Sequence, residues 1–131
     1  MFTLNLLYQQ RVIDLAHLQR ALVHFALDGL RYFAKFTSEA LQPYIYFQIY
    51  AWKVYHDTGF LIETGGKGSA SGLEIDPTKT LECLDIFSRR YLQILDCEDR
   101  SDGEELQAVL EELRAMTPFV QQIVDKVLPS V

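Results

Sequence analysis

The sequence has few of the residues that crosslink small proteins through disulfides. Its two cysteines, Cys83 and Cys97, lie fourteen residues apart on what reads as one helix. That separation is about 21 Å along a helix axis, which is too far for a disulfide. Because no secretory signal pattern is visible, we expect reduced thiols and a cytoplasmic location. No apolar run approaches the roughly 20 residues that a membrane-spanning helix requires, so no membrane span is expected.

Positive charge is also scarce, and the net charge is −6. Residues 1–66 hold five basic and five acidic side chains, whereas residues 67–131 hold seven basic and thirteen acidic ones. An acidic surface repels the phosphates of nucleic acids and the headgroups of anionic lipids. The composition therefore argues against a nucleic-acid partner.

Apolar side chains instead recur at helical spacing along a chain of one-domain size, so we treat residues 1–131 as a single domain. The first predicted helix is long, and Gly29 lies inside it because "LRYFAKF" continues the apolar period. Asp76 with Pro77 resembles a helix start. The periodicity predicts helices over residues 3–35, 37–59, 76–96, 101–116 and 117–128.

The later helices carry clear start signals. Ser101 with Glu104 three residues on forms a predicted capping box, and Thr117 with Pro118 starts the last helix. The predicted fold is all-α: an antiparallel bundle of four to five helices whose last helix is broken near Pro118. A long glycine-rich loop at residues 58–76 is predicted to connect the second and third helices of this bundle. The stretches "FLIET" and "LEI" within this loop leave a short hairpin open as an alternative.

The predicted helix over residues 37–59 is apolar all round, which is typical of a buried helix. A small bundle rarely surrounds one of its own helices, so this segment indicates an oligomer. Its aromatic side chains are the predicted contacts with a partner: Tyr46, Tyr50, Trp52 and Tyr55. The alternative is that these rings form the core of a single chain.

The glycine-rich stretch "ETGGKGSASG" raises the possibility of a phosphate-binding loop. A P-loop requires a glycine five residues before the Gly-Lys pair and a serine or threonine after the lysine. Leu61 and Gly68 occupy those positions around Lys67. With no parallel sheet to hold it either, we interpret the stretch as a flexible connection.

The histidines and carboxylates do not form a metal-binding pattern. Asp14 with His17 and His24 with Asp28 each share a helical face, but the two histidines lie about 10.5 Å apart along the axis. Glu82-x-x-Asp85 lies on the outer face, where Arg89 can pair with Asp85. The sequence therefore predicts no metal site and no cofactor.

Arg11 and His17 are separated by five residues, which resembles the Arg-x(4–6)-His motif of HEPN ribonucleases. The resemblance covers only these two positions. It implies a small helical domain that dimerises and cleaves RNA, with both side chains acting on the RNA phosphate. Val12 departs from the family, because a polar residue usually follows the arginine.

These observations favour a non-enzymatic function through protein surfaces. The leading hypothesis is a protein–protein interaction module, such as an adaptor, assembly factor or regulator, acting through the aromatic helix as a homodimer. The alternative is a HEPN-like ribonuclease that uses Arg11 and His17.

Overall fold

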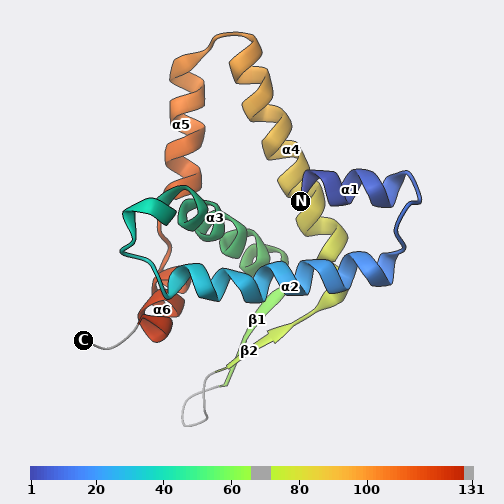
Figure 1. Cartoon of the computed structure of the whole chain (residues 1–131), viewed down its shortest axis with the longest axis vertical. Helices are drawn as coiled ribbons and strands as arrows, with labels where there is room; N and C mark the ends of the chain where they lie inside the picture. Colours follow the sequence, from blue (N-terminus) through green and yellow to red (C-terminus); the bar gives the residue numbers. More distant parts are fainter. Residues whose placement is uncertain (66–71, 129–131) are drawn as a thin grey trace.

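The computed structural model describes residues 1–65 and 72–128, and helices make up most of this part of the chain (Figure 1). The helical class predicted from the sequence is confirmed. The elements are helices α1 (Phe2–Gln9), α2 (Leu15–Phe33), α3 (Gln42–Thr58), α4 (Thr80–Asp99), α5 (Gly103–Arg114) and α6 (Pro118–Val127), strands β1 (Leu61–Thr64) and β2 (Gly72–Ile75), and 3₁₀ turns η1 (Glu39–Leu41) and η2 (Pro77–Lys79).

The prediction of one helix over residues 3–35 is wrong, because the chain turns between α1 and α2. The turn is a Schellman motif. The N–H of Arg11 donates to the carbonyl of Tyr8, and the N–H of Val12 donates to the carbonyl of Leu7. Arg11 has a left-handed backbone with φ of 60°, which ends the helical path of α1 without a glycine.

A new cap then starts α2. Asp14 accepts a hydrogen bond from the backbone N–H of His17 at 2.7 Å, which satisfies a donor of the first turn. As predicted, Gly29 lies within this helix, which continues to Phe33. The carboxylate of Asp14 therefore serves the backbone rather than a metal site.

The turn between α4 and α5 differs from the predicted capping box of Ser101 and Glu104. Ser101 has a left-handed φ of 53° and ends α4 in a second Schellman turn. Asp102 is the cap of α5 and accepts from the N–H of Glu105 at 3.1 Å. The cap predicted at Thr117 is confirmed at the start of α6.

Part of the segment predicted as a loop over residues 58–76 forms a β-hairpin, which confirms the alternative that the sequence left open for "FLIET" and "LEI". β1 pairs antiparallel with β2, and Leu61 lies opposite Ile75. Phe60 and Leu61 are buried, which fixes the base of the hairpin against the core. The middle of the glycine-rich stretch, residues 66–71, lies outside the described residues.

Helix α3 is the central element of the fold, in contact with α2, α4, α5, α6 and β1. The chain thus covers much of this apolar helix itself, while Tyr44, Tyr46 and Phe47 in its first half are exposed. The largest fully buried side chains come from α3 and its neighbours: Trp52, Tyr55, Phe33, Phe60, Leu18, Leu22, Ile45, Ile49, Leu84, Val120 and Val124.

Helices α4 and α5 form an antiparallel pair that extends away from the other helices (Figure 1). The two helices splay toward their base, where α3 crosses between them. The antiparallel bundle predicted from the sequence is therefore not confirmed.

Candidate functional site: a groove between the splayed helices

The four aromatic side chains predicted to contact a partner have different environments. Trp52 and Tyr55 are fully buried, and the Trp52 ring lies edge-on to Phe33 with centroids 5.5 Å apart. Tyr46 is exposed, with the guanidinium of Arg114 lying 5.7 Å from its ring centroid. Trp52 and Tyr55 thus belong to the core, and only Tyr46 and Tyr50 remain as predicted contacts.

Tyr50 lines a hollow of about 380 Å³ that we call the wedge groove. Met1 and helices α1, α3, α4 and α5 contribute to it. The lining residues are Met1, Thr3, Phe47, Tyr50, Phe87, Arg90, Tyr91, Ile94 and Leu113. Most of these side chains are apolar or aromatic, and two of the largest, Phe47 and Tyr91, are 44% and 45% exposed.

Phe87 joins the wedge groove to the core. Its ring centroid lies 6.4 Å from that of Phe47 and 5.6 Å from that of Tyr50, both of which line the groove. On its other side it meets the buried ring of Tyr55 at 5.9 Å. Aromatic pairs at these separations add to the stability of a packed cluster. The floor of the groove is therefore a fixed part of the fold.

Arg90 is the one charged side chain among the groove residues. Its guanidinium donates to Gln93 and to Glu112, both at 2.9 Å, and its side chain is 24% exposed. Burial raises the pKa of Tyr50, an effect that the nearby Arg90 partly offsets. The Tyr50 hydroxyl is therefore neutral at physiological pH, and the charge of the Arg90 guanidinium is compensated by the carboxylate of Glu112.

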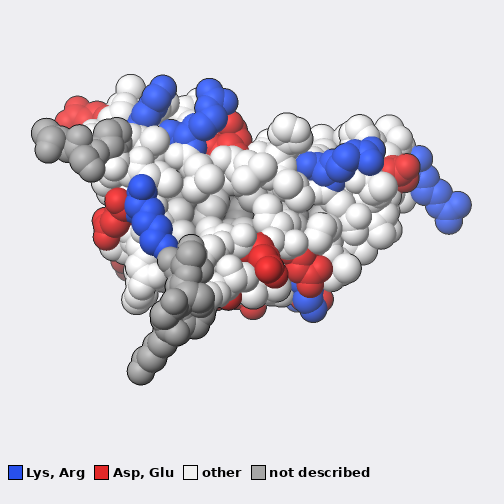
Figure 2. All heavy atoms as spheres, turned by 90° about the horizontal axis from the view of Figure 1, so that it is seen from below, with Lys and Arg blue, Asp and Glu red and all other residues white. Residues whose placement is uncertain are grey.

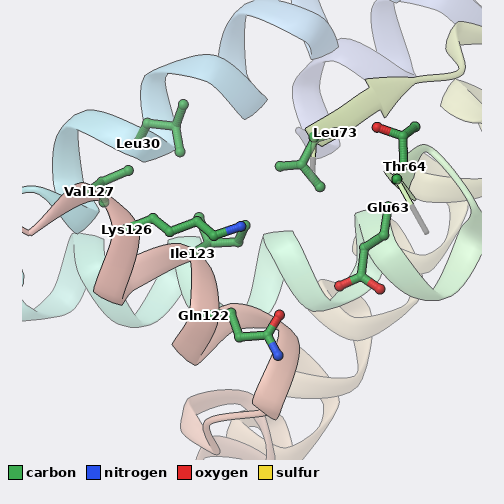
Figure 3. A pocket seen from close by; sticks show the side chains of 10 residues that line it. Leu30, Glu63, Thr64, Leu73, Gln122, Ile123, Lys126 and Val127 are labelled. Atoms are coloured by element: carbon green, nitrogen blue, oxygen red, sulfur yellow. The ribbon is translucent and has the colours of Figure 1, made fainter. Parts of the chain in front are cut away.

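A second hollow, of about 480 Å³, lies between the hairpin and α6 (Figure 3). Leu30, Leu73 and Ile123 form apolar parts of its lining, and Glu63 reaches into it from β1. Its polar side chains are Glu63 and Thr64 of β1 and Gln122 and Lys126 of α6. Among the described residues, no three metal-binding side chains gather at one point. We therefore do not take this hollow as the functional site.

The face of the molecule that carries α2, the hairpin and α6 has scattered charges separated by wide uncharged areas (Figure 2). Basic and acidic side chains alternate on it, and no broad basic patch gathers on this face. Separately, no helix in the described part of the chain has the length and apolar character that crossing a bilayer requires.

The motif residues of the ribonuclease alternative lie near the turn between α1 and α2. Arg11 lines a surface hollow there, and His17 is not among the residues that line it. His17 instead lies in the first turn of α2, where its backbone N–H binds Asp14. The geometry does not favour a shared site for these two side chains.

Other candidate chemical groups have structural roles. Asp28 accepts a hydrogen bond from Arg31 at 2.8 Å, and Asp85 pairs with Arg89 as the sequence indicated. Cys83 is buried 3.0 Å from the hydroxyl of Thr58, and burial raises the pKa of its thiol to about 11. A thiol with this pKa is protonated and unreactive at neutral pH.

Comparison of the chain with models of protein families, with curated proteins and with solved structures finds no match. The wedge groove therefore has to be interpreted from its own geometry.

Sequence reasoning missed most of the wedge groove. The periodic stripe of α4 includes Phe87, Tyr91 and Ile94, and periodicity places all three on an inner face. The structure shows that this stripe is covered at Phe87 and half open beyond it. Periodicity in the sequence identifies these apolar positions on α4, but it does not indicate which of them are buried in the folded chain.

Proposed function

We propose that this chain is a non-enzymatic protein–protein interaction module whose docking surface is the wedge groove. The observation that supports this is an open apolar groove with large aromatic side chains on its walls. Tyrosine and phenylalanine at such sites provide much of the binding energy in protein interfaces. An adaptor, assembly factor or regulator with a cytoplasmic location is the corresponding biological class.

The exposure of the groove walls favours a protein over a small molecule. Small-molecule sites bury about 70–90% of their ligand in a concave pocket. Phe47 and Tyr91 remain 44% and 45% exposed in the wedge groove, so they border an open surface. A segment that lies across the groove would bury both rings at once.

A homodimer remains part of the proposal as one possible form of this docking. The chain's own packing accounts for the buried side of α3, whereas Tyr44, Tyr46 and Phe47 of the same helix are exposed. A second copy would therefore have to bind at the wedge groove or at another exposed apolar surface. The ribonuclease alternative has no geometric observation in its favour.

The test uses two matched lysine substitutions on α4. Tyr91→Lys places a charge in the groove, whereas Leu92→Lys places it one residue away at a side chain that is 52% exposed and does not line the groove. Both variants are expected to keep the wild-type melting temperature within a few degrees, because both positions are exposed. Proteins captured from a host extract should be lost with Tyr91→Lys and retained with Leu92→Lys. If wild type and both variants capture the same proteins, the groove is not the docking surface.

A further inference from the structure

We propose that the outer edge of strand β2 is a second interaction surface, where an extended segment of a partner protein binds as a third strand and places a basic side chain opposite Glu74. This surface is separate from the wedge groove, because neither strand of the hairpin contributes a lining residue to that groove. Three observations carry the inference: the direction of the backbone groups of β2, the exposure of its outer edge, and the charge of Glu74.

The first observation is the hydrogen-bond pattern of the hairpin. The N–H of Asp76 donates to the carbonyl of Phe60 at 2.8 Å, and these two residues continue the register of the paired strands. In an antiparallel pair, residues that bond each other alternate with residues whose N–H and C=O point away from the partner strand. The backbone groups of Glu74 therefore point toward β1, whereas those of Leu73 and Ile75 point outward from the hairpin.

The second observation is that the outer edge of β2 is open in the described part of the chain. Helix α3 packs on β1, whereas no described helix makes a comparable contact with β2. Gly72, Leu73 and Glu74 are exposed, and the hairpin projects away from the helices (Figure 1). Outside the ladder with β1, no hydrogen bond of the described residues reaches the backbone groups of Leu73 and Ile75. An unpaired strand edge of this kind is a template for a further strand.

The third observation is the charge at the middle of this edge. Glu74 takes part in none of the ion pairs among the described residues. Like charges directly opposite each other on neighbouring strands are destabilising, and opposite charges are stabilising. If a second copy paired antiparallel through both Leu73 and Ile75, the two Glu74 carboxylates would lie opposite each other. The charge therefore favours a different chain, with lysine or arginine at this position, over a second copy.

The added strand has a defined side-chain pattern. Residues directly opposite each other in a sheet share a face, and successive residues of a strand point to opposite faces. Side chains opposite Leu73 and Ile75 would thus lie beside two apolar residues, one of them 38% exposed. The side chain between them would lie opposite Glu74 on the other face. The expected ligand is an extended segment with the pattern apolar–basic–apolar.

Selection of random peptides displayed on phage against the full chain tests this inference. We expect enrichment of peptides with an apolar–basic–apolar core that contains no proline, because each bonding residue of an added strand needs its N–H. Enrichment of acidic or proline-rich peptides, or of no peptide at all, would overturn the inference.

Two substitutions of one residue separate main-chain pairing from side-chain contact. Leu73→Pro removes an outward N–H and leaves the ladder with β1 intact, whereas Leu73→Ala keeps the N–H and shortens the side chain. By fluorescence anisotropy with an enriched peptide, Leu73→Pro should weaken binding about tenfold or more, and Leu73→Ala clearly less. Equal losses in the two variants would contradict the addition of a strand.

A charge reversal tests the contact with Glu74. The wild-type chain should prefer the enriched peptide over a version with glutamate in place of its basic residue, and Glu74→Lys should reverse that preference. An unchanged preference in Glu74→Lys would overturn the basic contact.

Amide exchange measured by NMR on the wild-type chain keeps the inference testable if Leu73→Pro does not fold. Without peptide, the outward amides of Leu73 and Ile75 should exchange quickly, whereas the amide of Glu74 is protected by its bond to β1. Saturating peptide should slow exchange of the two outward amides about tenfold or more. Unchanged exchange would overturn the inference, as would protection of these amides through dimerisation of the free chain, detected by light scattering.

Discussion

The close approach of α2 to the central helix predicts that Gly29→Ala destabilises the fold. A Cβ atom at Gly29 would lie 2.5 Å from Nε1 of Trp52 and 2.6 Å from Oε1 of Gln48. Ordinary contacts between heavy atoms lie near 3.5–4.0 Å, so both side chains would have to move by about 1 Å. All three residues are buried, which leaves little room for that movement.

The magnitude follows from two opposing effects. Overpacking a core costs about 1–3 kcal/mol, whereas alanine is a better helix former than glycine by about 1 kcal/mol. Because two contacts are violated at once, we expect the cost to exceed the gain and to lower the free energy of unfolding by about 1–2 kcal/mol. For a chain of this size, that corresponds to a fall in melting temperature of about 4–8 °C.

Circular dichroism during thermal and urea unfolding measures this effect. Gly103→Ala is the matched control, because a Cβ there meets no atom within 4 Å, and its melting temperature should be unchanged or slightly higher. If Gly29→Ala were as stable as the wild type, the described packing of α2 against α3 would be refuted.

Three further predictions test the turn, the thiol and the core. Arg11→Gly should raise the free energy of unfolding by up to about 1 kcal/mol in urea unfolding, because glycine adopts a left-handed φ without strain; a fall would contradict the Schellman turn. Cys83 should resist alkylation by iodoacetamide at pH 8 in the folded chain, because its raised pKa keeps the thiol protonated. The free energy of unfolding should fall from about pH 9 to 11, where only the unfolded chain releases the thiol proton. Cys83→Ser should make that fall smaller. Trp52→Ala should cost about 3–5 kcal/mol by urea unfolding and Tyr46→Ala under about 1 kcal/mol, and similar losses would contradict their different burial.

Local chemistry in the sequence predicted several element starts. Thr117 caps α6 as expected, and Asp76 does accept from a backbone N–H, although it opens the turn η2 rather than α4 directly. The turn at residues 10–14 escaped prediction because apolar spacing continues through it. Val12 fits the helical period but lies in the connection, where it is 66% exposed.

The candidate site was harder to predict because it depends on where long-range packing stops. All-round apolar character correctly indicated that much of α3 is buried, but it did not indicate that Tyr44, Tyr46 and Phe47 stay exposed. Tryptophan and tyrosine occur both in protein interfaces and in protein cores, so residue type alone does not place Trp52 and Tyr55. The packing of α2, α4 and α6 around α3 buries them in the core. The splay of α4 and α5 opens the groove at Tyr91, and no short stretch of sequence encodes that angle.

Photo-crosslinking from the groove tests the central claim most directly. Benzoylphenylalanine is placed at Tyr91 in the native host and, as a control, at Val12, which is exposed but does not line the groove. The account predicts a discrete crosslinked protein at position 91 that is absent at position 12. No crosslinked product at position 91, or the same products from both positions, would contradict it.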